Sequence, residues 1–237
     1  MKKYILLFCA FCAITAIFLA SGCSRPIEGT GPVVNQKMNL LAFTSLELEI
    51  DANVTIAISD SQQTILRAQE NIAQLIEFKS DGDELIIKSK EDFNTSSPVE
   101  IVLTAKQLKR IIVNGSGNVK VINPVRGQEL RVEINGSGDV ELNANVDKLR
   151  TEMNGSGDIV YTGKAMKQRI RMNGSGNLNA SALQTEECDI RIAGSGDASL
   201  NVNVSLDAEV LGSGNIHYTG TPKVQSEITG SGDISKN

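Results

Sequence analysis

The most regular feature of this sequence is an alternation of apolar and polar residues that fills its C-terminal half. In the segment 130–142, every second position before the glycine motif is apolar: Leu130, Val132 and Ile134. The alternation resumes after the motif with Val140 and Leu142. The same alternation returns in the segments 170–178, 190–200 and 206–218. A period of two is typical of half-buried β-strands, whereas an amphipathic helix has a period of 3.6. The pattern therefore predicts strands.

The string Gly-Ser-Gly, followed by Asn or Asp, occurs seven times within this pattern at intervals of 21, 19, 19, 20, 18 and 18 residues. Its first glycines are Gly115, Gly136, Gly155, Gly174, Gly194, Gly212 and Gly230. Glycine allows a positive φ or a close approach of two backbones without a Cβ clash. Strand, glycine turn, strand and second turn in this length form one coil of a β-solenoid, which must stack on others to bury its apolar side.

Two other architectures of short strands fit less well. A propeller blade needs about twice this period. An up-and-down barrel does not require one turn motif at every second strand end. The predicted fold is therefore all-β, a single-domain parallel β-helix (β-solenoid) with about seven Gly-Ser-Gly coils.

The region before the first motif also reads as strands. They are predicted at 46–50, 54–58, 64–68, 75–79, 85–88 and 99–103. Ser-Asp-Gly-Asp at 80–83 is a hairpin signal between two of them. Because an open solenoid end presents unpaired strand edges, we expect this region to be an N-terminal β-strand cap of the same domain.

The N-terminus has the features of a secretory signal. Lys2 and Lys3 precede an apolar run over 4–20, and Leu-Ala-Ser-Gly-Cys at 19–23 resembles a bacterial lipobox. This predicts a lipoprotein signal peptide over 1–22 and a lipidated Cys23, carrying palmitate, that anchors the chain to a membrane. An uncleaved transmembrane helix is the alternative, because 17 residues is near the lower length limit for a span.

Residues 23–39 are rich in Pro and Gly and predict a flexible tether, so that the solenoid domain occupies 40–237. Ser24 at the second mature position resembles outer-membrane sorting signals. The predicted location is the cell envelope, at the periplasmic face or the surface of the outer membrane.

Composition disfavours several functions. The net charge of −5 argues against nucleic-acid binding. One His, no Trp and few aromatic residues leave little for a His-based active site or for gripping sugars. Cys188 has the parity of inward residues and His217 that of outward ones, so they cannot form a dyad. We expect no enzyme and no cofactor; a polysaccharide-active solenoid enzyme, lyase or hydrolase, is the alternative.

Stacked coils would align two outward columns of side chains. The Asn or Asp after each Gly-Ser-Gly forms one column, in which Asp139 lies next to Asp158. These side chains are expected to cap turns; Ca²⁺ bound between carboxylates, in a Ca²⁺-stabilised surface binding protein, is the alternative. No other metal site is indicated.

The second column holds four arginines. Each lies four residues before the Asn that precedes one of the first four Gly-Ser-Gly motifs. They are Arg110, Arg131, Arg150 and Arg169. Neighbouring Glu residues favour a lattice of surface ion pairs, each worth little. The alternative is a ligand-binding face, made by these arginines with Asp139 and Asp158, for lipopolysaccharide phosphate or an acidic polysaccharide.

Residues 40–235 resemble the bacterial head GIN domain family, labelled autotransporter adhesins. The resemblance rests on the Asn-Gly-Ser-Gly-Asp/Asn strings that begin at 114, 135, 154 and 173, and on the closing segment 212–222. It implies adhesion or envelope interaction and supplies no catalytic residues. The expected function is therefore a non-catalytic binding or structural module, with envelope or host glycans or proteins as partners and a homo-oligomer left open.

Overall fold

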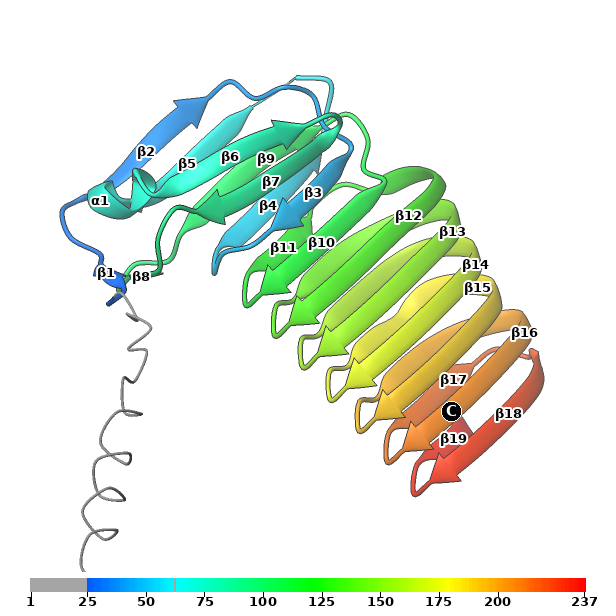
Figure 1. Ribbon diagram of the computed structural model, residues 1–237. Coiled ribbons are helices and arrows are strands. Elements are labelled where there is room, and N and C mark those ends of the chain that lie inside the picture. The colour runs from blue at the N-terminus through cyan, green and yellow to red at the C-terminus, as the bar shows by residue number, and fades with distance from the viewer. Residues whose placement is uncertain (1–24, 62) are drawn as a thin grey trace, which may run out of the picture.

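The protein is an all-β solenoid that forms a single domain, as the computed structural model shows for residues 25–61 and 63–237 (Figure 1). The predicted β-solenoid with its N-terminal cap is confirmed. The predicted signal peptide over 1–22 and Cys23 lie outside the described residues. None of the helices in the described ranges is long and apolar enough to span a membrane.

Two parallel faces build the solenoid, which we call front and back after the view of Figure 1. The front face stacks β10 (Arg110–Gly115), β12 (Val125–Gly136), the C-terminal halves of the next four strands and β18 (Lys223–Gly230). The back face stacks β11 (Asn118–Val121), the N-terminal halves of those four strands, β17 (Asn215–Thr219) and β19 (Asp233–Lys236). The four strands that bend across both faces are β13 (Val140–Gly155), β14 (Ile159–Gly174), β15 (Leu178–Gly194) and β16 (Ala198–Gly212).

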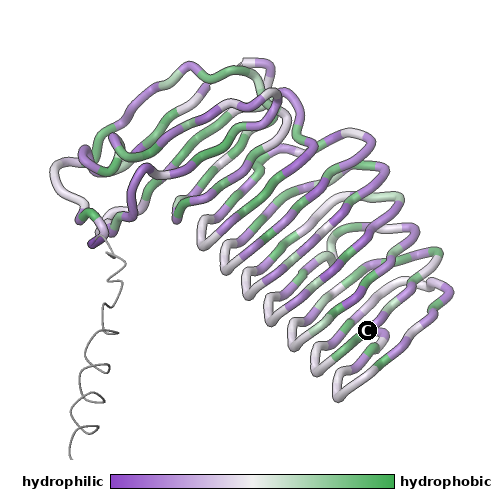
Figure 2. Tube along the Cα trace, in the orientation of Figure 1, coloured by the Kyte–Doolittle hydropathy of each residue, from purple (hydrophilic) through white to green (hydrophobic). Residues whose placement is uncertain are grey.

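Consecutive coils stack in register, so equivalent repeat positions form straight columns. Arg131 pairs with Arg150, Asn135 with Asn154, and Gly136 with Gly155. The inward positions alternate with outward ones and fill the space between the faces: Leu130, Val132 and Ile134 are completely buried. Figure 2 shows this alternation of apolar and polar residues along the coils. The period of two in the sequence thus gives the solenoid its apolar core.

The N-terminal cap adds two more layers, stacked in an order opposite to their order in the chain. β3 (Ser45–Leu48) and β4 (Asn53–Ile58) pair in parallel with β10 and β11. β7 (Glu84–Ser89) and β9 (Glu100–Ala105), which come later in the sequence, pair with the outer sides of β3 and β4. The later strands therefore lie farther from the Gly-Ser-Gly coils than the earlier ones.

Antiparallel strands complete the cap. β6 (Ile76–Asp81) pairs with β7 through the predicted hairpin turn, in which Gly82 has a φ of +61°. β5 (Thr64–Gln69) pairs with β9, and the helical turn α1 (Glu70–Ala73) joins β5 to β6. Ile72 of α1 is completely buried. The helical turn thus closes the apolar core at this end.

Part of the predicted tether is instead ordered structure. β2 (Val33–Met38) pairs antiparallel with β5, and β1 (Ile27–Glu28) pairs with β8 (Phe93–Asn94). Val34 and Met38 pack against the core from β2. The Pro and Gly content of 23–39 is misleading here because the edge of β5 supplies hydrogen-bonding partners that no local pattern reveals. The folded domain therefore begins before residue 40.

Candidate functional site

The Gly-Ser-Gly corners stack directly on one another. At the corners that begin at Gly136, Gly174, Gly194, Gly212 and Gly230, the N–H groups of the serine and of the second glycine converge on one carbonyl of the preceding coil. Those of Ser137 and Gly138 donate to the oxygen of Gly115 at 2.8 and 3.1 Å. The first glycines have positive φ values, for example +137° at Gly174. A Cβ there would overlap with the carbonyl oxygen of Gly155. Both predicted roles of glycine, positive φ and close approach, are present.

The Asn/Asp column follows the corners along the back face. In each coil but the last, the side-chain Oδ1 of this residue accepts a hydrogen bond from the backbone N–H of its equivalent one coil further on. Asp139 accepts from Asp158 at 2.8 Å, and Asp158 accepts from Asn177 at 3.1 Å. These side chains therefore cap the turns, as expected, but across coils rather than within one turn. Within 25–61 and 63–237, no three His, Cys, Asp or Glu side chains are placed to hold a metal ion.

A ladder of asparagine amides precedes the corners on the front face, a feature that the repeat pattern alone did not reveal. The Nδ2 of Asn135 donates to Asn114, that of Asn154 to Asn135 and that of Asn173 to Asn154, over 2.8–3.0 Å. Asn114 in turn donates to the carboxylate of Glu47 in the cap. The ladder ends at Asn173 because Ala193 takes the next position.

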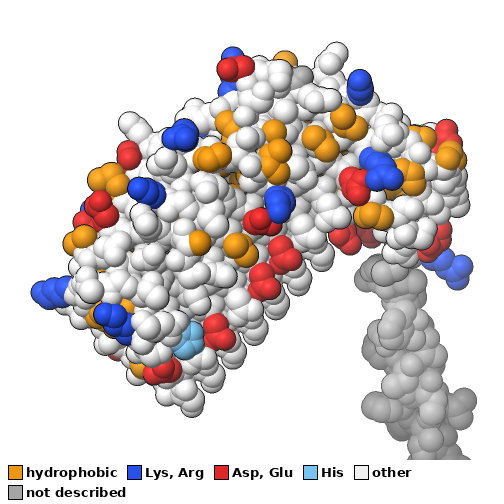
Figure 3. All heavy atoms as spheres, turned by 180° about the vertical axis from the view of Figure 1, so that it is seen from behind, with side chains coloured by type: hydrophobic (Ala, Val, Ile, Leu, Met, Phe, Trp, Pro, Cys, Tyr) orange, Lys and Arg blue, Asp and Glu red, His pale blue; other side chains and the backbone are white. Residues whose placement is uncertain are grey.

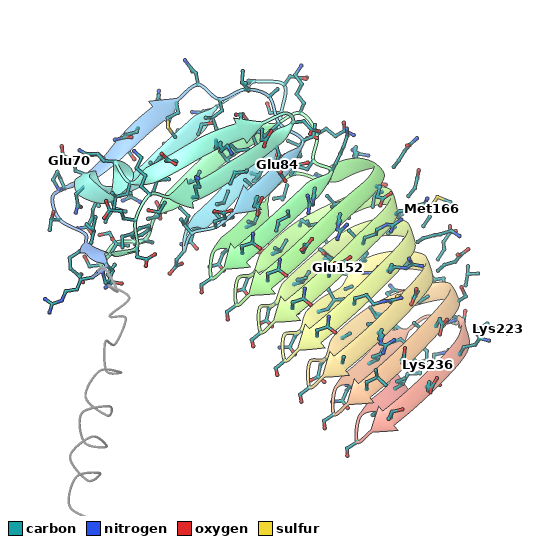
Figure 4. All side chains as sticks on the ribbon, viewed as in Figure 1. Glu70, Glu84, Glu152, Met166, Lys223 and Lys236 are labelled. Carbon is teal, nitrogen blue, oxygen red and sulfur yellow. The ribbon has the colours of Figure 1, made fainter. Side chains whose placement is uncertain are left out.

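The four predicted arginines do form one column on the front face. Each lies within 4 Å of a carboxylate. Arg110 contacts Glu84 and Glu133, Arg131 contacts Glu133 and Glu152, Arg150 contacts Glu129, and Arg169 contacts Asp189. Figure 4 shows Glu152 among these front-face side chains. The arrangement is the predicted lattice of ion pairs; a ligand-binding role of these arginines with Asp139 and Asp158 stays a prediction.

One ion pair of this lattice is bidentate. Both terminal nitrogens of Arg171 donate to the carboxylate of Asp189, at 2.9 and 3.0 Å. Hydrogen bonding to Arg171 holds the pKa of the Asp189 carboxyl below its usual range. At the cap end of the same face, burial and the carboxylates of Glu49 and Glu84 raise the pKa of Glu47.

The same features identify the family. The family model described as "Putative auto-transporter adhesin, head GIN domain" matches residues 42–222. The chain belongs to the head GIN domain family. No curated protein matches this head GIN chain.

Solved structures share the fold of this head GIN protein. A putative adhesin from Bacteroides fragilis NCTC 9343 is 23% identical with a TM-score of 0.83, over 89% of this chain and 100% of its own. A putative lipid binding protein from Parabacteroides distasonis ATCC 8503 is 24% identical with a TM-score of 0.77, over 90% and 100%. A putative adhesin from Parabacteroides merdae ATCC 43184 is 21% identical with a TM-score of 0.68, over 90% and 100%.

The structure separates Cys188 and His217, as predicted. Cys188 points into the core of the head GIN domain, where burial raises the pKa of its thiol well above the usual range. A thiolate nucleophile is therefore disfavoured at this position. His217 lies on the outside of β17, and its Nδ1 is 3.0 Å from the hydroxyl of Ser235.

The back face of this head GIN domain carries a strip of side chains without Asp, Glu, Lys or Arg, most of them polar, that we did not predict. Successive strands place Val160, Asn179, Ser199 and His217 in one column. We call the following residues the neutral strip: Val160, Thr162, Asn179, Ser181, Ser199, Asn201, His217 and Thr219. Figure 3 shows this side, with the single His in pale blue and mostly white side chains in the middle of the solenoid. The strip could have been found by comparing the outward positions beyond the Asn/Asp column with the outward positions before each corner.

Proposed function

We propose that this head GIN protein is a non-catalytic, lipid-anchored adhesion module of the cell envelope that binds a neutral glycan chain along the neutral strip. The observation that carries the proposal is the contrast between the arginine column and the neutral strip. The arginines of the column are occupied by carboxylates, whereas the neutral strip presents mainly hydroxyls and amides and contains no Asp, Glu, Lys or Arg. Such groups form hydrogen bonds with sugar hydroxyls at little desolvation cost compared with ions.

The repeat of the strip supports a polymeric ligand. Coils follow one another at about 4.8 Å, the distance between neighbouring strands, so the strip presents similar groups at regular steps. Family membership and the similarity to solved adhesins support adhesion rather than catalysis.

Binding of residues 25–237 to immobilised neutral and anionic polysaccharides tests the ligand class. We expect binding to a neutral polymer, with at least a tenfold weaker affinity for Ser199→Lys, which places a charge in the middle of the strip. The matched control, Arg150→Gln on the front face, should bind like the wild type. Binding to anionic polymers alone, with loss in Arg150→Gln, would contradict the proposal and favour the arginine column. Release of shorter sugars from the polymer would support the polysaccharide-active enzyme.

The anchor has its own test. Radiolabelled palmitate should be incorporated into the wild-type full-length chain in bacteria and not into Cys23→Ala. The Cys188→Ala chain is the matched control and should be labelled like the wild type. Equal labelling of the Cys23→Ala chain would rule out lipidation at this residue.

A further inference from the structure

The last coil of the solenoid leaves one edge of each face unpaired. β18 pairs with β16, and β19 pairs with β17. Among residues 25–61 and 63–237, no strand pairs with the outer side of β18 or β19. A strand that is paired on one side only presents a row of N–H and C=O groups to any further strand. This end of the molecule therefore has the hydrogen-bonding capacity to continue both faces.

The apolar core is also uncovered at this end. Ile228 of β18 is 44% exposed, whereas Val210, its partner in the preceding coil, is completely buried. Val224 and Ile234 are partly buried against the core, while Leu206 and Ile216, their partners, are buried. Ile228, Val224 and Ile234 would thus lose water contact if another layer stacked on the last coil.

The opposite end of the molecule cannot supply that layer in the same way. There the core is closed by α1, whose Ile72 is completely buried, and the faces end in the antiparallel strands β2 and β6. A head-to-tail continuation of parallel coils is therefore blocked. A contact between two identical C-terminal ends remains, and such a contact is closed by a two-fold axis.

The charges of β18 favour this two-fold contact. A rotation of 180° about an axis normal to the faces places β18 antiparallel to β18 of a second copy, and β19 antiparallel to its own copy. With Gln225 on the axis, Lys223 lies opposite Glu227 of the second copy, twice. All three residues occupy outward positions of the front face, and neither Lys223 nor Glu227 has an ion pair within the described part of the chain. Opposite charges directly across an antiparallel pair are stabilising.

We propose that the C-terminal end of the solenoid is a self-association surface, at which β18 and β19 pair with the same strands of a second copy of this chain. β1 lies at the other end of the molecule from β18 and β19, and Lys223 and Lys236 mark the associating end (Figures 1 and 4). The two β1 strands therefore lie at opposite ends of the dimer. Together with the anchor proposed at Cys23, this arrangement would join two facing membranes through the C-terminal ends of two copies. The joining of membranes rests on the proposed function, whereas the dimer does not.

Sedimentation velocity on residues 25–237 tests the dimer. The wild type should form dimers as its concentration rises. Lys223→Glu and Glu227→Lys should each be monomeric at the same concentrations, because each brings like charges together at both ends of the strand pair. An equimolar mixture of the two variants should form dimers again, since every opposed pair is then of opposite charge. This rescue cannot come from misfolded variants.

The opposite results would overturn the proposal: a wild type that stays monomeric, single variants that dimerise like the wild type, or a mixture that stays monomeric. Vesicles that display the chain from an N-terminal His tag on nickel-chelating lipid test the tip-to-tip geometry separately. Wild-type vesicles should aggregate, Lys223→Glu vesicles should not, and Lys223→Glu and Glu227→Lys vesicles should aggregate when mixed. Dimers in solution without vesicle aggregation would refute the bridging geometry and leave the dimer standing.

Discussion

At each corner of the solenoid the two glycines meet different demands of the backbone. The first takes a positive φ, and both lie so close to the preceding coil that a Cβ would overlap with a carbonyl oxygen, as at Gly136 and Gly138. Gly115 is the exception, because nothing lies within 4 Å of a Cβ at this position. The motif was recognised from the sequence, but the contacts of individual glycines depend on which layer lies beneath them.

This difference gives a matched pair of substitutions. Gly174→Ala should lower the free energy of unfolding by at least about 2 kcal/mol, because it combines a strained φ with a clash against Gly155. Gly115→Ala has a φ of +112° but open space, so it should cost only about 1–2 kcal/mol of backbone strain. Urea unfolding followed by circular dichroism measures both. Equal losses would show that stacking of the corners does not require glycine.

A second residue of interest is Gln168, which is buried in the core with its Nε2 unpaired. Its Oε1 accepts a hydrogen bond from Thr185, which is also buried. The double variant Gln168→Leu with Thr185→Val should raise the free energy of unfolding by about 1–3 kcal/mol, because it removes an unsatisfied donor. Leu149 already occupies the equivalent position one coil earlier. A lower melting temperature in the double variant would contradict this reasoning.

At the scale of the elements, the alternation placed most strands, including all six predicted in the cap. The alternation could not give the order of the layers, because the segments 46–58 and 85–103 share one pattern. Only tertiary packing places β7 and β9 farther from the Gly-Ser-Gly coils than β3 and β4. Nor could the alternation find β2, whose pairing with β5 depends on an available edge. The asparagine ladder was missed because amide-to-amide contact follows from exact register, which spacings of 18 to 21 residues leave open.

The end of this ladder provides a stabilising substitution. Ala193→Asn adds an amide whose Nδ2 can donate to Asn173, and it should raise the free energy of unfolding by about 0.5–1.5 kcal/mol. Asn154→Ala should have the opposite sign, because it removes the hydrogen bonds to Asn135 and from Asn173. Thermal melts of both variants check the prediction. No gain from Ala193→Asn together with no loss from Asn154→Ala would mean that the ladder contributes nothing.

The ion pairs between coils predict a dependence on acid. The pKa of Asp189 is lowered in the folded state by Arg171, so this carboxylate stabilises the fold fully above its unfolded pKa of about 3.9. That stabilisation is lost as the pH falls through the lower, folded pKa. Asp189→Asn should therefore weaken the fold at neutral pH and reduce its further loss of stability in acid. The control Asp207→Asn, in the same column but without an ion pair in the described residues, should keep the wild-type acid profile.

For the molecule as a whole, the Asn/Asp column runs the length of the solenoid, and its hydrogen bonds allow a prediction about calcium. Its Oδ1 atoms are engaged by backbone N–H groups of the following coils, and Asn alternates with Asp except between Asp139 and Asp158. We therefore expect the melting temperature to be unchanged between EDTA and millimolar Ca²⁺. A higher melting temperature in Ca²⁺ would favour a bound cation, since a ligand of the folded state stabilises it.

The sequence was enough to predict the family and an adhesin-like surface module, because seven copies of one motif specify the fold. The prediction did not reach the neutral strip, although each of its residues is visible in the sequence. The strip depends on which outward positions share a face, and that becomes apparent only when the coils are stacked. The arginines were easy to find in the sequence because they recur at one position of the repeat. In the structure they are poor candidates for binding an anionic ligand, because neighbouring carboxylates already pair with them.

The coils differ in length, yet their Gly-Ser-Gly corners remain in register. The irregularities lie elsewhere, between Val160 and Thr162, between Ala180 and Gln184 and between Thr185 and Glu187, around the corner at the far end of the back face. Additional residues are thus absorbed on one side of the molecule while the other side keeps a constant pitch. This makes the segment around Ala182, which is exposed, a natural graft point: a foreign peptide inserted there would be displayed from the scaffold without displacing the neighbouring coils.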